Sequence, residues 1–207
     1  MAETYTTVLH ESETEFEEKR SVFIGRAKHV KTEAEAADFI KEIKKKHRDA
    51  KHNVYAYVLG DGIIQRYSDD GEPQGTAGMP VLDIIRKSGC TDTVIVVTRY
   101  FGGILLGAGG LVRAYSHSAK LAIEAAEPAT FEKYAVLRLA CPYSEYGKYL
   151  AELEKLGAVL DETEFAENVV LNFAVKETGL EKLEKMITEV SCGKLCAEKS
   201  GERFDYR

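Results

Sequence analysis

Tryptophan is absent from this sequence of 207 residues, and proline and cysteine occur only four times each. No apolar run approaches the roughly 20 residues that a membrane-spanning helix requires, and the N-terminal residues lack the basic-then-apolar layout of a secretion signal. Basic residues are the minority, with 28 Lys and Arg against 34 Asp and Glu and a formal net charge of −6. This balance argues against a broadly cationic nucleic-acid coat but allows a local basic patch. We therefore expect a cytoplasmic protein without a membrane segment.

The cysteines, Cys90, Cys141, Cys192 and Cys196, do not form a recognisable ligand set. Cys192 and Cys196 are not at a usual zinc-knuckle spacing, and no histidine follows them to complete a site. We predict reduced thiols of a cytoplasmic protein, with no metal and no cofactor.

A glycine-rich stretch, residues 99–113, joins a predicted buried strand (93–98, TVIVVT) to a predicted helix. A helix that begins at Gly109-Gly110 directs free N–H groups and the positive end of its dipole at the preceding loop, which favours an anion. The alternative is that the glycines only allow the helix to pack closely on a sheet. The candidate residues for binding an anion or nucleic acid are Arg99, Tyr100, Phe101, Gly102, Gly103, Gly107, Gly109, Gly110 and Arg113.

A second unusual stretch, residues 68–80, consists mostly of turn-forming residues. We expect Pro80 in the first turn of a helix that Gly89 closes. Acidic side chains here suit either a metal or general base, or simple hydrogen bonding to turn N–H groups, which is the commoner role. We predict no catalytic residue and no metal ligand. The candidate residues of this second loop are Asp70, Gly71, Glu72, Gly75, Thr76 and Gly78, with Asp69 beside them.

The rest of the first half alternates between strands and one helix. A strand over 21–30 precedes a helix that opens with the capping box Thr32-x-x-Glu35. This helix ends in a cluster of cations at 44–48, with Lys51 and His52 just beyond it. The cluster is either a solvated helix end or a patch for a phosphate backbone. Two strands follow, over 53–59 and 63–67, and Gly60-Asp61-Gly62 predicts a hairpin turn between them.

The pattern changes after a break at 127–130. Beyond it we predict the order β-α-β-β-α-β, which is the ferredoxin-like arrangement. The expected second helix is capped by Thr178-x-x-Glu181, and the expected last strand is Lys194 to Glu198. The sequence therefore predicts an α+β protein with two domains, residues 1–128 and 129–207.

Three segments together resemble the IMPACT/YigZ family: residues 17–24, residues 70–80 (DGEPQGTAGMP) and residues 96–115 (VVTRYFGGILLGAGGLVRAY). The resemblance implies an N-terminal domain with the fold of ribosomal protein S5 domain 2, and a C-terminal ferredoxin-like domain similar to those of elongation factor G. It also implies a link to translation, because the family's eukaryotic members compete for the activator of a stress kinase. Bacterial members with two domains are suspected of binding nucleic acid or the translation machinery. Leu105 stands where the family more often carries lysine.

Three functions fit these features. The first is a cytoplasmic, translation-associated regulatory protein that binds RNA or a ribosome-associated partner through the glycine-rich loop, with arginines on phosphate and aromatic rings under bases. The second is an enzyme acting on a phosphorylated small molecule, with the loop as phosphate cradle, as in the small-molecule kinases that share the S5-type fold. No Gly-x-x-x-x-Gly-Lys-Ser/Thr motif is present to support it. The third is a protein-interaction module without nucleic-acid binding. The sequence leaves the oligomeric state open.

Overall fold

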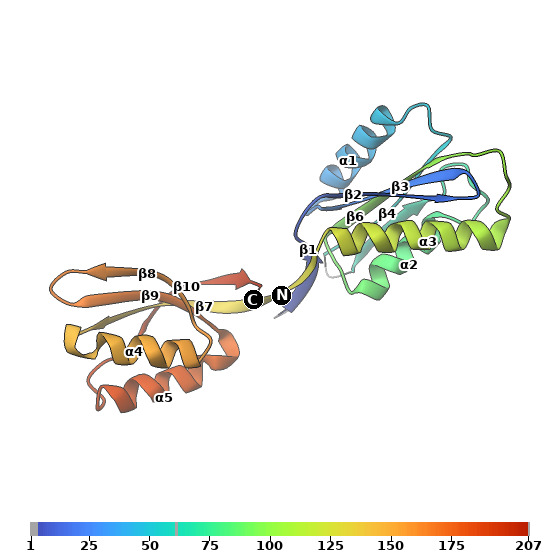
Figure 1. Ribbon diagram of the computed structural model, residues 1–207. Helices are drawn as coiled ribbons and strands as arrows, with labels where there is room; N and C mark the ends of the chain where they lie inside the picture. The colour runs from blue at the N-terminus through green and yellow to red at the C-terminus, as the bar shows by residue number, and fades with distance from the viewer. Residues whose placement is uncertain (1–3, 61, 207) are drawn as a thin grey trace. The chain divides into compact units, whose positions relative to one another are not determined.

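The protein was studied as a computed structural model, which describes residues 4–60 and 62–206. The chain divides into two compact units, residues 1–130 and 131–207 (Figure 1). Each unit combines helices with a sheet, so the predicted α+β organisation in two domains is confirmed. Asp61, in the predicted hairpin turn, lies outside the described residues. Among the described residues, no helix is both long and apolar enough to cross a bilayer.

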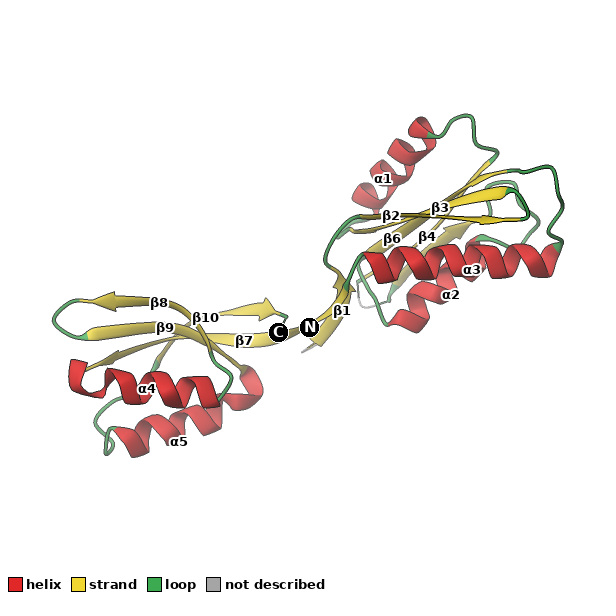
Figure 2. Cartoon of the chain, in the orientation of Figure 1, coloured by secondary structure: helices red, strands yellow, loops and turns green. Residues whose placement is uncertain are grey.

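The N-terminal unit contains a five-stranded sheet in the order β2-β3-β6-β4-β5, in which all neighbouring strands are antiparallel. Helices α2 and α3 cover one face of the sheet and α1 covers the other (Figures 1 and 2). The elements are β1 (Thr4–Val8), β2 (Ser12–Glu18), β3 (Ser21–His29), α1 (Glu33–Lys46), β4 (His52–Leu59), β5 (Ile64–Ser68), α2 (Gly78–Ser88), β6 (Thr93–Tyr100) and α3 (Ala108–Ala125).

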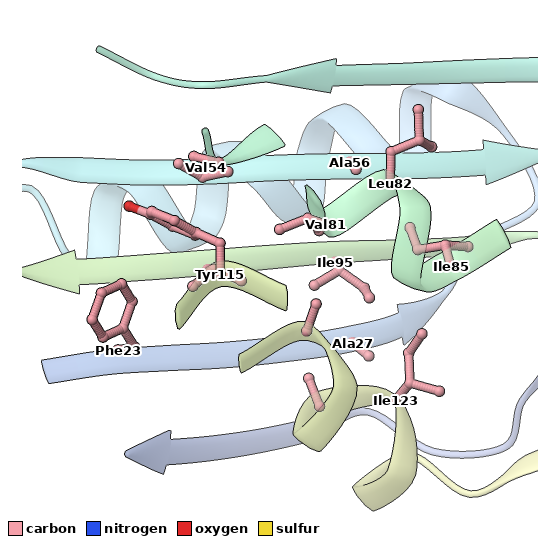
Figure 3. Packing of buried hydrophobic residues seen from close by; sticks show 14 of the residues in the cluster. Phe23, Ala27, Val54, Ala56, Val81, Leu82, Ile85, Ile95, Tyr115 and Ile123 are labelled. Atoms are coloured by element: carbon pink, nitrogen blue, oxygen red, sulfur yellow. The ribbon is translucent and has the colours of Figure 1, made fainter. Parts of the chain in front are cut away.

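Strand β6 occupies the centre of this sheet, and helices cover both of its faces. Its residues 93–99 are all buried, which explains why the sequence reads TVIVVT rather than an alternating pattern. On one face, Ile95 packs with Leu82 of α2 and Tyr115 of α3 in a single core cluster (Figure 3). On the other face, Val94 and Val96 pack in a cluster with apolar residues of α1. Each large apolar side chain buried in this way contributes about 1.5–3 kcal/mol to the free energy of folding.

The predicted helix ends of this unit agree with the structure. The Glu35 N–H donates to Thr32 Oγ1 at 3.2 Å, so Thr32 caps α1. Gly89, with φ of 72°, ends α2, and Pro80 lies in the first turn of that helix. Helix α3 begins at Ala108, one residue before the predicted start.

The C-terminal unit has the βαββαβ order that the sequence predicts, with sheet order β10-β7-β9-β8 and neighbouring strands antiparallel. Side chains from α4 and α5 share one core cluster with β7 and β9, and Figure 2 shows both helices on one face of the sheet. This is a ferredoxin-like arrangement. The elements are β7 (Pro128–Cys141), α4 (Tyr143–Lys155), β8 (Val159–Phe165), β9 (Val169–Lys176), a short 3₁₀ helix (Glu177–Gly179), α5 (Leu180–Val190) and β10 (Glu198–Asp205).

Two predictions for this unit are wrong. Thr178 does not cap α5, because it lies inside the 3₁₀ helix and α5 begins only at Leu180, without a side-chain cap. The last strand is not Lys194–Glu198 but β10, which pairs with β7 along an edge of the sheet. Leu195 and Ala197 pack against the helix-side core before the strand starts, so their apolar character marks a packed loop and not a strand.

Candidate nucleic-acid interface

Several loops meet at one end of the N-terminal sheet because of the strand register. Arg99 lies opposite His52 at the start of β4, and Tyr100 lies opposite Val22 at the start of β3. The glycine-rich loop after β6, the loop after β5 and the last turn of α1 therefore converge there. We call this region the basic end, and define it by exposed cations that have no ion pair with any described residue: Lys19, Arg20, Lys45, Arg48, Lys51 and Arg113.

Arg99 and Glu72 form a buried ion pair below the basic end. Arg99 Nη1 donates to Glu72 Oε1 at 2.6 Å, and the two residues are only 5% and 9% exposed. Tyr115 of α3 donates its hydroxyl to the same oxygen at 2.8 Å. Burial, followed by the negative charge of Glu72, raises the pKa of Tyr115, so this hydroxyl remains a donor. The sequence analysis predicts that the Arg99 guanidinium binds an anion. The structure shows that this guanidinium is already paired with an internal carboxylate, that of Glu72.

A pocket of about 400 Å³ opens beside this ion pair. Its lining includes Lys51, His52, Glu72, Arg99, Phe101 and the first residues of the α3 region, and we call it the Arg99 pocket. Helix α3 starts there with Gly107 at the N-cap and no side-chain cap, so the N–H groups of its first turn are available to a ligand.

Aromatic and apolar side chains form the rim of the Arg99 pocket. Phe101 is 45% exposed, and its ring lies 5.9 Å from Lys51 Nζ and 5.5 Å from the guanidinium carbon of Arg99. Leu105 is 82% exposed on the same rim. An exposed ring flanked by cations is an arrangement that accepts a stacked base next to a phosphate.

Arg113 lies in a different pocket from Arg99. The second pocket, of about 270 Å³, is lined by Arg113, Lys19, Glu18, Gly110 and His117, and shares Leu106 with the Arg99 pocket. The structure thus places the two arginines on separate sides of the start of α3. Tyr100 lies elsewhere again: its hydroxyl is 2.9 Å from His47 Nδ1 and donates to Asp49 at 3.2 Å.

Two glycines of the motifs are explained by close contacts. A Cβ on Gly102 would lie 1.9 Å from the carbonyl oxygen of Arg20, so only glycine fits beside the β2–β3 turn. Gly71 has φ of 86°, and a Cβ there would lie 3.4 Å from the His52 ring. Of the other candidate glycines, Gly75, Gly103 and Gly107 have positive φ, Gly78 packs on the Ser68 backbone and Gly110 lies near Leu106. A Cβ on Gly109 would lie 4.0 Å from Arg113 Nη1, an ordinary contact distance.

The aspartates of the second loop accept hydrogen bonds from backbone N–H groups. Asp69 accepts three, from Gly75, Ala77 and Gly78, at 2.8–3.1 Å. Asp70 accepts the N–H of Asn53 at 2.7 Å and pairs with Lys44 at 2.6 Å. These contacts hold the loop in place, as the turn-forming interpretation describes.

The Thr76 hydroxyl likewise donates within the loop, to the Pro73 carbonyl at 2.7 Å. Across residues 4–60 and 62–206, no cluster of three or more His, Cys, Asp and Glu side chains is arranged to hold a metal ion.

Sequence reasoning placed Lys51 and His52 beside the cluster of cations at 44–48 and Tyr115 on the helix after the glycine-rich stretch, but it named none of the three as a candidate site residue. Their convergence at this end of the sheet depends on strand order. A usable signal was present, because Lys51 directly precedes the buried strand β4 and His52 is its first residue, and binding residues are often found where loops meet a sheet's end.

The fold and two family models define the class of protein. The N-terminal unit matches the Impact N-terminal domain over residues 19–123, and the C-terminal unit matches a domain of unknown function (DUF1949) over residues 139–194. The chain is 40% identical to IMPACT family member YvyE of Bacillus subtilis, covering 94% of this chain and 90% of that protein.

A second relative and a solved structure agree with this match. IMPACT family member YigZ of Escherichia coli is 32% identical, with 86% of this chain and 88% of that protein covered. A crystal structure described as that of a hypothetical protein aligns with a TM-score of 0.61 and 29% identity, over 97% of this chain and 99% of the other. The chain belongs to the IMPACT family.

Proposed function

We propose that this protein acts in the cytoplasm, in association with translation, by binding single-stranded RNA at the basic end of its N-terminal domain. The observation that supports this most is the Arg99 pocket, where the uncapped start of α3, the unpaired cation Lys51 and the exposed ring of Phe101 come together. The association with translation follows from family membership and from what the family resemblance implies for its eukaryotic members.

The chemistry of the basic end suits a flexible polyanion. The six exposed cations of the basic end lie around the loops at one end of the sheet, in a chain whose net charge is −6. These cations give this end a local excess of positive side chains. Phosphates bind to Lys and Arg side chains and to free N–H groups at a helix start, whereas bases stack on exposed rings. A single strand can follow such a curved, mixed surface because its bases are not paired.

Binding of this kind depends strongly on salt. If about three phosphates are neutralised, the logarithm of the affinity falls with the logarithm of salt concentration with a slope of about −2. The test is fluorescence anisotropy of a labelled 12-residue oligouridylate, measured at several salt concentrations. Lys51→Ala is expected to weaken binding several-fold and to make the slope shallower by roughly 0.7, the value for one phosphate contact with a single strand.

A matched control is available in the same unit. Lys87 is an exposed lysine in the last turn of α2, near the opposite end of the sheet, and has no ion pair with a described residue. Lys87→Ala is expected to bind RNA like the unchanged protein. Equal losses for Lys51→Ala and Lys87→Ala, or binding that does not respond to salt, would contradict the proposal.

The other two functions have less support. Asp69 and Asp70, which an enzyme acting on a phosphorylated small molecule would use for Mg²⁺, are engaged by backbone N–H groups and by Lys44. An interaction module without nucleic-acid binding would show itself if the protein co-sedimented with ribosomes equally well before and after Lys51→Ala.

A further inference from the structure

Strand β8 of the C-terminal unit has a free outer edge. It forms a hairpin with β9 (Figure 1), and among the described residues β9 is the only strand that pairs with it. In such an edge strand, every second residue directs its N–H and C=O groups away from the sheet. Strand β8 has seven residues, which is an ordinary length for a strand that pairs on both sides. The sheet can therefore accept one more strand at this edge.

An apolar pocket of about 320 Å³ lies beside this edge. We call it the β8 pocket, and its lining residues come from α4, from β8 and its preceding residues, and from β9: Leu150, Leu153, Glu154, Ala158, Leu160 and Phe173. Leu160 of β8 is 43% exposed there. At the other end of β8, Phe165 is 62% exposed, and its ring centroid lies 5.8 Å from that of Tyr146 in α4. Strand β8 thus presents partly exposed apolar side chains on the face that α4 covers.

The opposite face of β8 carries carboxylates. Glu162 and Glu164 flank Thr163, so their side chains share one face of the strand. Glu164 Oε1 accepts a hydrogen bond from Asn172 Nδ2 at 2.7 Å. Asn172 lies in β9 between two residues of the helix-side core, so its own side chain and the two glutamates are on the face away from α4. Both glutamates are exposed, and neither forms an ion pair with a described residue.

The charge of β8 decides between the possible occupants of its edge. The strand (VLDETEF) contains Asp161, Glu162 and Glu164 and no cation. Pairing with the β8 strand of a second copy would bring like charges together across the new ladder, which is destabilising, and a nucleic-acid strand is repelled for the same reason. By contrast, β10 (EKSGERFD), which pairs only with β7, carries charges of both signs and favours neither.

An extended cationic peptide fits both faces of β8 at once. In a strand, successive side chains point to opposite faces, so a segment in which Lys or Arg alternates with apolar residues separates the two kinds of side chain. Its cations then lie over Glu162 and Glu164, and its apolar side chains lie on the side of the β8 pocket. The backbone hydrogen bonds supply affinity, whereas the pocket and the carboxylates supply specificity.

We propose that the C-terminal unit binds a basic, extended segment of a partner protein as an additional strand along β8. An apolar side chain of that segment occupies the β8 pocket, and its cations pair with Glu162 and Glu164. This interaction goes beyond the proposed RNA binding and does not depend on it, because it uses other residues in the other unit.

The test uses the full chain and a labelled peptide of the sequence Lys-Val-Lys-Leu-Lys-Val-Lys, with binding measured by fluorescence anisotropy. A peptide with Glu in place of each Lys keeps the apolar residues and is expected to bind at least about tenfold more weakly, because each attractive pair across the ladder becomes repulsive. A peptide with Ser in place of Leu is expected to bind about threefold more weakly, because it has no apolar anchor for the pocket. Similar affinities for the basic and acidic peptides would overturn the proposal.

A pair of double variants separates β8 from the general acidity of the chain. Glu162→Lys with Glu164→Lys is expected to weaken binding of the basic peptide by at least about tenfold. Glu181→Lys with Glu184→Lys changes the net charge by the same amount at exposed positions of α5, and is expected to change the affinity by less than about twofold. Equal losses in the two double variants would overturn the proposal.

Hydrogen exchange then locates the bound peptide without any substitution. An added strand protects the outward-facing amides of β8, so their exchange is expected to slow by at least about fivefold while that of the β10 amides stays unchanged. Protection of β10 instead of β8 would overturn the proposal. A dimer of the chain that protects β8 in the absence of peptide would overturn the assigned partner in favour of a second copy.

Discussion

The buried pair of Arg99 and Glu72 allows a quantitative test of how the pocket is held together. We consider Glu72→Gln, which keeps an acceptor for Tyr115, Arg99→Met, which keeps the length of the side chain, and the double variant. Each single change leaves the partner in a site that is at most 9% exposed. The double variant removes both charges together.

The magnitude follows from the short distance and the burial. Two unit charges centred about 4 Å apart attract by about 4 kcal/mol at an effective dielectric constant near 20. Removing one member of a buried pair costs about 3–5 kcal/mol, because the other charge is left unpaired. We expect the double variant to lose about 4 kcal/mol rather than the roughly 6–10 kcal/mol of the two single losses added, which gives a coupling energy of about 2–6 kcal/mol.

The measurement must report on the N-terminal unit alone, because a protein of two units need not unfold in one step. Native-state hydrogen exchange of the β4 and β6 amides provides this, since these strands carry His52 and Arg99. A coupling energy below about 0.5 kcal/mol would refute the reasoning, and would mean that the two side chains are held in place independently.

Three further predictions concern single positions. Gly102→Ala is expected to lower the melting temperature strongly, because the new Cβ meets the Arg20 carbonyl oxygen at 1.9 Å. Gly109→Ala, within α3, is expected to stabilise by about 0.5–1 kcal/mol, because the new Cβ would lie at an ordinary contact distance of 4.0 Å from Arg113 Nη1. Equal melting temperatures of the two variants would contradict this contrast. Burial lowers the pKa of His47 from its reference value of 6.5, so the unfolded chain binds a proton more readily than the folded protein. The free energy of unfolding should therefore decrease as the pH falls below about 6.5. Denaturation between about pH 5 and 8 should show this pH dependence, and His47→Gln should reduce it. Leu105→Lys introduces a cation at the rim of the Arg99 pocket and is expected to tighten RNA binding a few-fold at low salt. The same anisotropy assay measures this change, and an unchanged affinity would show that Leu105 is not part of the binding surface.

Local patterns were enough to predict most helices and strands. The Thr32 cap, the Gly89 terminator and the apolar spacing from Leu111 to Ala122 each act within a few residues, so sequence alone places α1, α2 and α3 closely. The prediction failed at β10, whose residues EKSGERFD are mostly polar. The sequence of an edge strand with little apolar contact does not alternate strongly between apolar and polar residues. The position of β10 is instead determined by its pairing with β7.

The sequence predicts less well which side chains meet at the candidate site. Arg99 and Glu72 are 27 residues apart, and nothing in either motif indicates that they pair. Their meeting depends on β6 lying between β3 and β4, an order that apolar periodicity does not encode. The same order places His52 opposite Arg99, so neither the internal ion pair nor the position of His52 in the Arg99 pocket could be predicted from the sequence.

The concentration of cations at one end of the N-terminal sheet, in a chain with a net charge of −6, has a consequence for encounters with partners. Under the proposed function, the negative net charge repels a polyanion at long range, and the exposed cations of the basic end attract it locally. Productive collisions are thus oriented before contact, and indiscriminate adsorption along nucleic acid is suppressed. Under the proposed function, contact with a nucleic-acid strand is therefore confined to the loops at this end of the N-terminal sheet.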